Sequence, residues 1–587
     1  MRLAVSALAL AALAASGCRP HGAASPDLQQ KAQQSADPRV RDYYAAEDSA
    51  PLWTDGEQAT EAADALLQRL CGAVADGLNP ADYGLDSLQA LRNRLATSPT
   101  PATLAAFEVQ ATEAFVRFAK DLGRGRVDAR ALGAEWHLKG DTLQEARALT
   151  ALRTHGLAAA LDSLSQHGNG YEPLRQAVAR YQQVVAAGGW ATLPTRAGDE
   201  ALRQRLALEG DLDSTAADSA AASVAIAASG AAASVADGLR AFQRRHGLRA
   251  TGTLNDSTRA ALNVPAEVRL AVLEANLERL RWMPSSFGPT YVSVNLPAFH
   301  LEAWENGRKV MEMPVIVGSE AHSTPAFADT MRYLAFAPYW NVPASIATRT
   351  LAGKSAGFYQ SGGYEVLRGN TVVSASEATH ANLEAQRVRL RQKPGPKNSL
   401  GNVKFMFPNR HAIYLHDTPA TELFSRQNRT LSSGCIRVSQ PDSLALWALG
   451  PNGGWNAARV DSAMAGTKEQ RVDLTRQIPV YLVYQTAWVD SSGAVHFRPD
   501  VYGHDARLLA AMNGAPGATP SPISSDSTRT DSARTGTPAA RAAANADSTG
   551  TWSDTLAAPR ILAAAPETLT LRRLAALPAA CQAPPAR

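Results

Sequence analysis

A cysteine and a histidine in the second half of the sequence have the chemistry of an acyl-transfer pair. The segment Leu431–Val438, LSSGCIRV, places Cys435 directly after Ser433 and Gly434, and His416 lies 19 residues earlier in AIYLHDTP. An imidazole beside a thiol accepts the thiol proton, and the thiolate then attacks a carbonyl carbon. Glycine allows a substrate carbonyl to approach the backbone, and the amides near Gly434 and Cys435 are placed to donate to a developing oxyanion.

The residues before His416 alternate in polarity, which predicts a strand. Ile413 and Leu415 would share one face, and Tyr414 and His416 the other. If the aliphatic pair faces the core, Tyr414 and His416 face a cleft together. The chain has 12 histidines and 4 cysteines, so the spacing alone leaves a coincidental, structural pair as the alternative.

Other chemistries have little support in the sequence. His411 and His416 are five residues apart and would point to opposite faces of a strand, and HExxH is absent, so we predict no metal and no cofactor. Ser432 and Ser433 lack the GxSxG context of a hydrolase serine. With 58 basic and 54 acidic residues, a net charge of +4 argues against a nucleic-acid partner.

The N-terminus predicts export. MRLAVSALALAALAASGC carries Arg2, an apolar run and then Cys18, a pattern typical of a secretory signal and too short for a spanning helix. Its ending resembles a bacterial lipobox, in which Cys18 is lipidated; a plain signal peptide cut nearby is the alternative. We expect a periplasmic or envelope protein, lipid-anchored, with the outer membrane favoured. Export permits disulfides, but we predict Cys71 to be a small buried residue, and Cys581 lies in a Pro/Ala-rich tail.

The chain predicts a multidomain α+β protein, since 587 residues exceed a single core. Glu305-Asn306-Gly307 is a hairpin signal between two β-rich runs. The predicted parts are a signal peptide (1–18), a helical scaffold (38–212), a low-complexity linker (213–234), a compact unit (235–265), a β-rich catalytic domain (266–510) interrupted at about 350–400, and a disordered tail (514–587).

NRHAIYLHDTPATELFSRQNRTLSSGCIRV resembles the active-site segment of the L,D-transpeptidases, with their YkuD-type catalytic domain. It is most similar to the long, scaffolded YcbB-like branch. Further similar blocks are FAPYWNVPASIA, LRQKPGPKNSLGNVKFMFPN, NLERLRWMP and, toward the N-terminus, PLWTDG, DGLNPADYGL and GRGRVDARALGAEWHL. GLRAFQRRHGLRATGTLNDSTRAALN resembles a peptidoglycan-binding module of three short helices.

The resemblance implies roles for named residues. Cys435 matches the nucleophile, His416 the proton donor and acceptor, and Gly434 and Ser433 the strip that shapes the oxyanion hole and orients the histidine. Much of the wider family has histidine where this chain has Ser433. The remaining matches are cleft residues that bind substrate or else serve packing and loop structure (Tyr414, Trp340, Asn341, Arg429), and residues of the peptidoglycan-binding module (Leu239, Phe242, Gln243, Gly247, Leu248, Gly252, Leu262).

The resemblance also implies a reaction on peptidoglycan. Cys435 would attack the third residue of a tetrapeptide stem, release D-Ala and hold the stem as a thioester, and a neighbouring stem's amine would complete a 3→3 cross-link. The 350–400 insertion matches the family's lid, which excludes water. Water as acceptor would make the enzyme an L,D-carboxypeptidase, and two further hypotheses are a wall-binding anchor and a thiol-dependent wall hydrolase. The expected partners are donor and acceptor stems and, through the lipid, a membrane, with room for other wall-synthesis proteins.

Overall fold

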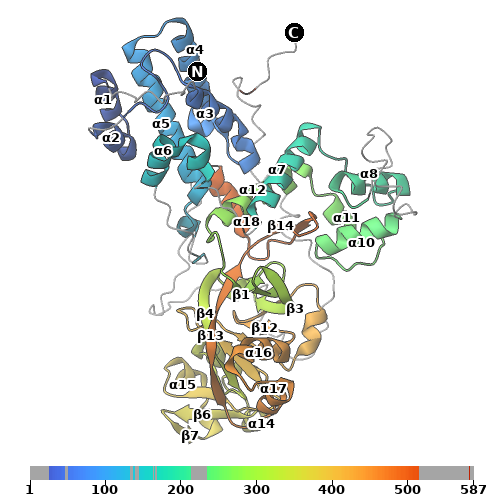
Figure 1. The fold of residues 1–587 in the computed structure, drawn as a ribbon. Helices are drawn as coiled ribbons and strands as arrows, with labels where there is room; N and C mark the ends of the chain where they lie inside the picture. The colour runs from blue at the N-terminus through green and yellow to red at the C-terminus, as the bar shows by residue number, and fades with distance from the viewer. Residues whose placement is uncertain are drawn as a thin grey trace, which may run out of the picture.

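The computed structural model describes residues 25–46, 50–132, 136–138, 145–162, 164, 168, 170–212, 234–513 and 581. The predicted signal peptide, nearly all of the predicted linker and, Cys581 excepted, the predicted disordered tail lie outside these residues. The N-terminal helices lie in the upper part of Figure 1, and most strands, with several helices beside them, lie in the lower part. Within the described ranges, every helix is too short or too polar to cross a membrane.

The N-terminal helices form one core around the long helix α5. Thr100 begins α5 with a capping box to Thr103, and the buried Glu108 accepts a hydrogen bond of 2.8 Å from the Tyr44 hydroxyl. This bond gives the buried carboxyl a partner. The core is built from α1 (Pro26–Gln33), α2 (Pro38–Ala45), α3 (Glu61–Cys71), α4 (Leu85–Thr97), α5 (Pro101–Arg124) and α6 (Glu145–Asp162).

Helix α12 (Ala266–Arg281) joins the helical and the β-rich parts. It is buried on nearly every side, packs against α7 (Tyr171–Ala186), and shares the core of the large sheet. Its buried Arg279 forms an ion pair of 2.5 Å with Asp505, which belongs to α18 (His504–Met512). Helix α7 therefore belongs to the core of the β-rich part, although we predicted residues 38–212 as one scaffold.

A small unit beside this core differs from the predicted three-helix module. Residues 235–265 contain two helices, α10 (Val235–Arg245) and α11 (Asp256–Leu262), and the third helix of their core is α8 (Asp199–Glu209). The predicted linker thus separates helices that share one core. Local sequence could not reveal this, because the side chains that meet lie on either side of the low-complexity segment.

Nine strands form one sheet that closes on itself, since β3 pairs with β2 as well as with β12 and β11. The prediction of a hairpin at Asn306-Gly307 is confirmed: both residues have positive φ, and β2 pairs antiparallel with β3 on either side of them. The strands are β1 (Thr290–Asn295), β2 (His300–Glu305), β3 (Arg308–Gly318), β4 (Phe327–Phe336), β9 (Val403–Met406), β10 (Leu415–His416), β11 (Thr430–Ser432), β12 (Ile436–Val438) and β13 (Gln470–Val483).

An insertion between β4 and β9 carries its own sheet and its own apolar core. The sheet runs β5 (Trp340–Asn341), β8 (Arg389–Gln392), β6 (Tyr364–Arg368) and β7 (Thr371–Val373), with α13 (Ala344–Ile346), α14 (Ala356–Ser361) and α15 (His380–Glu384) beside it. This part lies at the bottom of Figure 1. The remaining elements are α16 (Pro441–Leu449), α17 (Ala457–Met464) and the hairpin β14 (Ala487–Val489) and β15 (Val495–Phe497).

Candidate active site

A parallel pairing of two short strands brings the predicted histidine and cysteine to one face of the sheet. β10 pairs with β12 so that Leu415 lies opposite Ile436, and both side chains are fully buried in the core. Because side chains alternate along a strand, Tyr414 and His416 on one strand share the opposite face with Cys435 on the other. The rings of Tyr414 and His416 lie 5.7 Å apart.

His416 is held as a neutral imidazole. Its side chain is 5% exposed, and its Nδ1 lies 2.5 Å from the carbonyl oxygen of Asp417. A carbonyl only accepts, so Nδ1 carries the proton and Nε2 is free to act as a base. Burial, followed by the positive charge of Arg437, lowers the pKa of His416 to about 3, against the opposing effect of the Asp417 carbonyl.

Cys435 is a free thiol and half-buried. Its Sγ donates to the carbonyl oxygen of Ala412 at 3.7 Å. Burial raises the pKa of the Cys435 thiol, although hydrogen bonds from the amide and hydroxyl of Tyr414 and the charge of Arg437 act in the other direction. Since the thiol pKa is raised and the imidazole pKa is lowered, the resting pair is a neutral thiol and a neutral imidazole.

Tyr414 links the thiol to the inserted sheet. Burial raises the pKa of its phenol, and interaction with Cys435 raises it further, whereas a hydrogen bond with Trp340 lowers it. Trp340 lies in β5, so a residue of the insertion reaches the residue beside the thiol. Asn341, its neighbour, is exposed and accepts a hydrogen bond of 3.3 Å from Arg389.

The turn before Cys435 is fixed by side chains that sequence reasoning did not select. The Ser432 hydroxyl donates to the Cys435 carbonyl at 2.5 Å and accepts from the Gly434 amide at 3.1 Å. Thr324, 110 residues before Gly434, donates to the Gly434 carbonyl at 2.7 Å. Only the distant pairing of strands brings Thr324 here, so no local signal could have identified it.

The Gly434 amide already donates a hydrogen bond to the Ser432 hydroxyl, so it is not available to an oxyanion. Gly434 has a φ of +116°, which suits glycine, and its neighbour Ser433 is exposed. The Cys435 amide donates no hydrogen bond to any other residue that the structure describes. Of the two amides that the sequence suggested, the one at Cys435 is therefore available to an oxyanion.

The contacts of Arg429 match the loop-structuring alternative. Its guanidinium donates to the carbonyls of Val315 at 3.1 Å, Arg426 at 2.9 Å and Phe299 at 3.1 Å, and it lies over the Phe299 ring. Burial lowers the pKa of Arg429. These contacts engage all three nitrogens and give no support to a substrate-binding role.

Most of the residues predicted to belong to a peptidoglycan-binding module are internal residues of the small unit that α10 and α11 form with α8. Leu239, Phe242 and Leu262 are buried in the core shared with α8. The Gln243 amide donates to the Thr253 carbonyl at 2.9 Å and accepts from the Gly252 amide at 2.9 Å. Any ligand of this unit must therefore contact other side chains. The other two predicted residues, Leu248 and Gly247, lie at its edge, where the Gly247 carbonyl accepts a hydrogen bond from Gln427.

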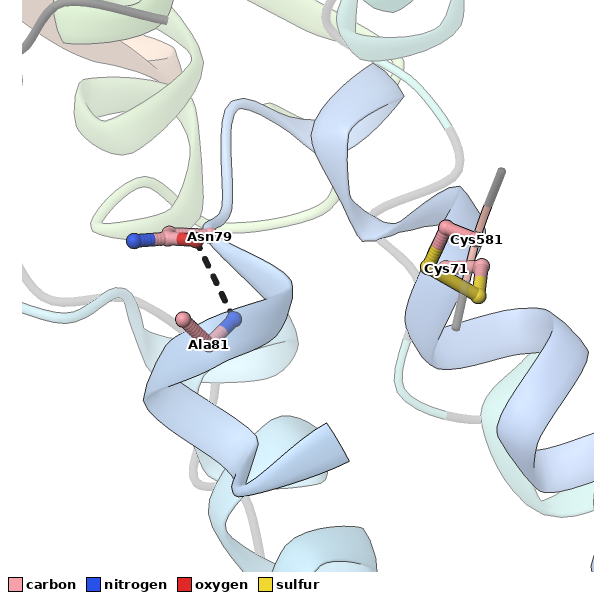
Figure 2. The surroundings of a disulfide bond; sticks show 4 residues. All are labelled: Cys71, Asn79, Ala81 and Cys581. Carbon is pink, nitrogen blue, oxygen red and sulfur yellow. Dashed lines mark hydrogen bonds between the residues drawn. A yellow bond between two sulfur atoms is a disulfide. The ribbon is translucent and has the colours of Figure 1, made fainter. Parts of the chain in front are cut away.

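The prediction for Cys71 was wrong. Cys71 is half-buried at the end of α3 and forms a disulfide with Cys581 across 510 residues of sequence (Figure 2). Both cysteines pack against the core of the N-terminal helices. A contact of this sequence separation has no local signature, so a lone cysteine on an apolar helix face resembles an ordinary core residue.

One group of side chains has the composition of a metal site. His300, Glu302 and Glu312 place a ligand atom each within 4.8 Å of one another on the β2–β3 hairpin. Lys309 forms ion pairs with both carboxylates, so its ammonium group already offsets one of the two negative charges.

Comparison with known proteins identifies two parts of the chain. A family model described as a scaffold domain matches residues 38–178, and one described as the L,D-transpeptidase catalytic domain, YkuD, matches residues 289–461. A curated protein of Haemophilus influenzae named "Putative L,D-transpeptidase" is 35% identical over 247 residues, which are 41% of this chain and 50% of that protein. The chain thus spans about half the length of the curated relative it matches.

Among solved structures, one titled "Structure of the Ldtfm-avibactam carbamoyl enzyme" covers 34% of this chain and 51% of its own, with 11% identity and a TM-score of 0.14. A likeness this low carries no argument. The family models and the curated relative agree with each other and with the resemblance of the active-site segment. Residues 289–461 are an L,D-transpeptidase catalytic domain of the YkuD family, and the chain joins it to an N-terminal scaffold domain.

Proposed function

We propose that this protein forms 3→3 peptidoglycan cross-links with Cys435 as nucleophile and His416 as proton acceptor and donor. The observation that carries the proposal is the parallel pairing of β10 with β12, which sets His416, Tyr414 and Cys435 on one face of the sheet. The catalytic-domain family supplies the substrate class, which is the peptide stem of peptidoglycan.

The first step transfers an acyl group to sulfur. Nε2 of His416 takes the proton of the Cys435 thiol as the sulfur attacks the carbonyl carbon of the third stem residue. The S–C bond forms, the C–N bond to D-Ala breaks, and the imidazolium returns the proton to the departing amine. Because the resting pair is neutral, the proton moves together with the attack, not before it.

The turn around Cys435 supports charge development on the substrate oxygen. The Cys435 amide would donate to the oxyanion, while Gly434 keeps the backbone accessible and its own amide holds Ser432. Ser433, which is exposed, would face the substrate from the same strip. In the second step, His416 removes a proton from the side-chain amine of a neighbouring stem as that amine attacks the thioester carbon. The new C–N bond forms, the C–S bond to Cys435 breaks, and the imidazolium returns the proton to the departing sulfur, which restores the thiol.

The inserted sheet would act as the lid of this site. It carries Trp340, which meets Tyr414 beside the thiol, and its own apolar core allows it to move as a unit. We assign Tyr414, Trp340 and the exposed Asn341 to the substrate-binding wall. Since the Cys435 thiol is half-buried, water can also reach it, and an L,D-carboxypeptidase is the second candidate.

The remaining proposals concern location. The small unit with α10 and α11 would bind glycan strands and so hold the enzyme on its substrate, and Cys18 would carry the lipid that anchors it to a membrane of the envelope, the outer membrane being favoured. Lipid labelling of the protein in cells, lost in Cys18→Ser, would support the anchor. Secretion of an unlabelled protein would instead support a plain signal peptide.

The test combines the purified enzyme, residues 25–587, with a disaccharide-tetrapeptide and mass spectrometry of the products. A cross-linked dimer that has lost one D-Ala, together with a stem-sized adduct on Cys435, is the expected result, and Cys435→Ala should give neither. Tripeptide without dimer would make the enzyme a carboxypeptidase under these conditions. Identical products from enzyme and variant would refute the catalytic proposal and favour a wall-binding anchor.

A further inference from the structure

The scaffold side of the chain reaches the catalytic domain close to the candidate nucleophile. Residues Trp136–Leu138 run beside the residue that precedes β4. Trp136 pairs with Ala326 in a parallel bridge, and the His137 amide donates to the Ala326 carbonyl at 2.7 Å. The Trp136 ring also packs edge-on against Trp282 at 5.1 Å. This short segment is therefore anchored by backbone and by side chain.

From this fixed segment, the His137 ring packs against a second histidine, His411. Its ring stacks on the ring of His411 with centroids 4.5 Å apart, and Phe327 packs on His411 at 4.9 Å. Arg410 donates from Nη2 to Nδ1 of His137 at 2.5 Å. An arginine can only donate, so His137 accepts at Nδ1 and is neutral in this contact.

His411 belongs to a tight turn that ends beside the thiol. Asn409 holds this turn from within, because its Oδ1 accepts from the His411 amide at 2.9 Å and its Nδ2 donates to the Ile413 carbonyl at 2.7 Å. Ala412 has a φ of +53°, a conformation that a residue with a side chain adopts only when its surroundings require it. The Ala412 carbonyl accepts from the Cys435 thiol at 3.7 Å.

We propose that His137 of the scaffold side is a positioning residue for the nucleophile, because its stack on His411 fixes the turn whose Ala412 carbonyl holds the Cys435 thiol. The inference rests on the proposed function of Cys435. It assigns to the scaffold a part in the chemistry: the catalytic domain alone would lack one side of the support for this turn.

The charges around the stack make the contact dependent on pH. His411 is faced by His137 from the scaffold segment, by Arg410 from its own turn and by the apolar Phe327 from β4. Burial, and then the charges of His137 and Arg410, lower the pKa of His411. Protonation of the His411 imidazole would place a second positive charge beside the Arg410 guanidinium, so acid should release the turn.

The test compares His137→Ala and His137→Phe with His155→Ala, a matched control in which an exposed scaffold histidine of α6 is removed. In the full chain, His137→Ala should lower kcat of cross-linking by roughly 3- to 10-fold, the size expected when one ring stack is lost, with KM changed less than about 2-fold. His137→Phe keeps the stack and should retain at least half of kcat. His155→Ala should match the wild type.

A second readout does not depend on the reaction. A carbonyl oxygen beside sulfur favours the protonated thiol, so release of the Ala412 carbonyl should lower the apparent pKa of Cys435 and raise its alkylation by iodoacetamide at pH 7 by about 2- to 3-fold. Hydrogen exchange should rise in the 407–414 peptide alone. If the wild type forms no cross-links but His137→Ala is still alkylated faster than the wild type, the proposed function is refuted and the role of His137 is not.

Three results would overturn the role of His137. One is an alkylation profile in His137→Ala that equals the wild type. Another is faster hydrogen exchange spread over the whole catalytic sheet, which would indicate general loosening. The third is a His137→Phe variant as impaired as His137→Ala, because the stack would then not be the interaction that matters.

Discussion

The buried imidazole of His416 should make the stability of the catalytic sheet depend on pH, and His416→Asn should remove that dependence. Burial and the charge of Arg437 lower the pKa of His416 to about 3, whereas the unfolded chain returns to the ordinary value of 6.5. The folded state thus stays neutral where the unfolded chain binds a proton. Its stability falls as the pH drops below 6.5 and the loss levels off near pH 3.

The size of the effect follows from the two pKa values. Between pH 7.5 and pH 4.5, proton binding by the unfolded chain should cost the fold about 2.7 kcal/mol, which is roughly two pH units at 1.36 kcal/mol each. This energy depends little on the pKa of His416 in the folded state, since any pKa below about 4 leaves the imidazole mostly neutral at pH 4.5. Asparagine cannot titrate, and its amide N–H can still donate to the Asp417 carbonyl.

The assay is urea unfolding of wild type and His416→Asn at both pH values. Hydrogen-exchange mass spectrometry on peptides of β4 and β13 reads the transition of the catalytic sheet separately from the other cores. For each protein, the free energy of unfolding at pH 4.5 is subtracted from that at pH 7.5, and the value for the variant is then subtracted from the value for the wild type. The contributions of other buried titratable groups, such as His246, cancel in this difference. His155→Asn controls for the substitution itself.

A difference near 2.7 kcal/mol would support a neutral, buried His416. A difference below about 0.5 kcal/mol would mean that His416 already accepts a proton in the folded state at pH 4.5, which corresponds to a much smaller pKa shift. Cys435 and His416 would then rest as a thiolate–imidazolium ion pair before the substrate binds, and not as a neutral thiol and a neutral imidazole.

Two further changes test other parts of the structure. Gly401 has a φ of +60°, and Gly401→Ala would place a Cβ well inside contact distance of the Asp417 carboxyl group. We therefore expect the free energy of unfolding to fall by roughly 2–3 kcal/mol and activity to fall with it. A variant that unfolds at the same urea concentration as the wild type would contradict this. Iodoacetamide added to the denatured, unreduced protein should label Cys435 but neither Cys71 nor Cys581, and all three should be labelled after reduction; peptide mass spectrometry that finds labelled Cys71 before reduction would rule out the disulfide.

Local patterns predicted the features that depend on neighbouring residues. The alternation around His416 predicted which side chains share a face, because the period of a strand is fixed by its backbone. The Asn306-Gly307 dipeptide predicted a hairpin, because few other residues adopt positive φ at both positions of a tight turn. The resemblance to a known family then pointed to Cys435 and His416 as a pair, which spacing alone left open.

Features that depend on distant pairing were not predictable in this way. The parallel alignment of β10 with β12, the arrival of Thr324 at Gly434 and the packing of α8 with α10 each join residues with no sequence relation to one another. The same holds for the contact between His137 and His411. Such contacts are selected by the whole core, in which each element adds a small part of the buried area.

The Cys71–Cys581 bond turns almost the whole chain into a covalent ring. A single backbone cut anywhere between these two residues, even inside the catalytic domain, would leave both fragments attached to each other until the disulfide is reduced. The bond also requires that residue 581 has been made, so a chain that ends before Cys581 cannot close the ring. Ring closure thus distinguishes molecules that reach Cys581 from shorter ones. A gel run with and without reductant would reveal nicked molecules that otherwise migrate as intact ones.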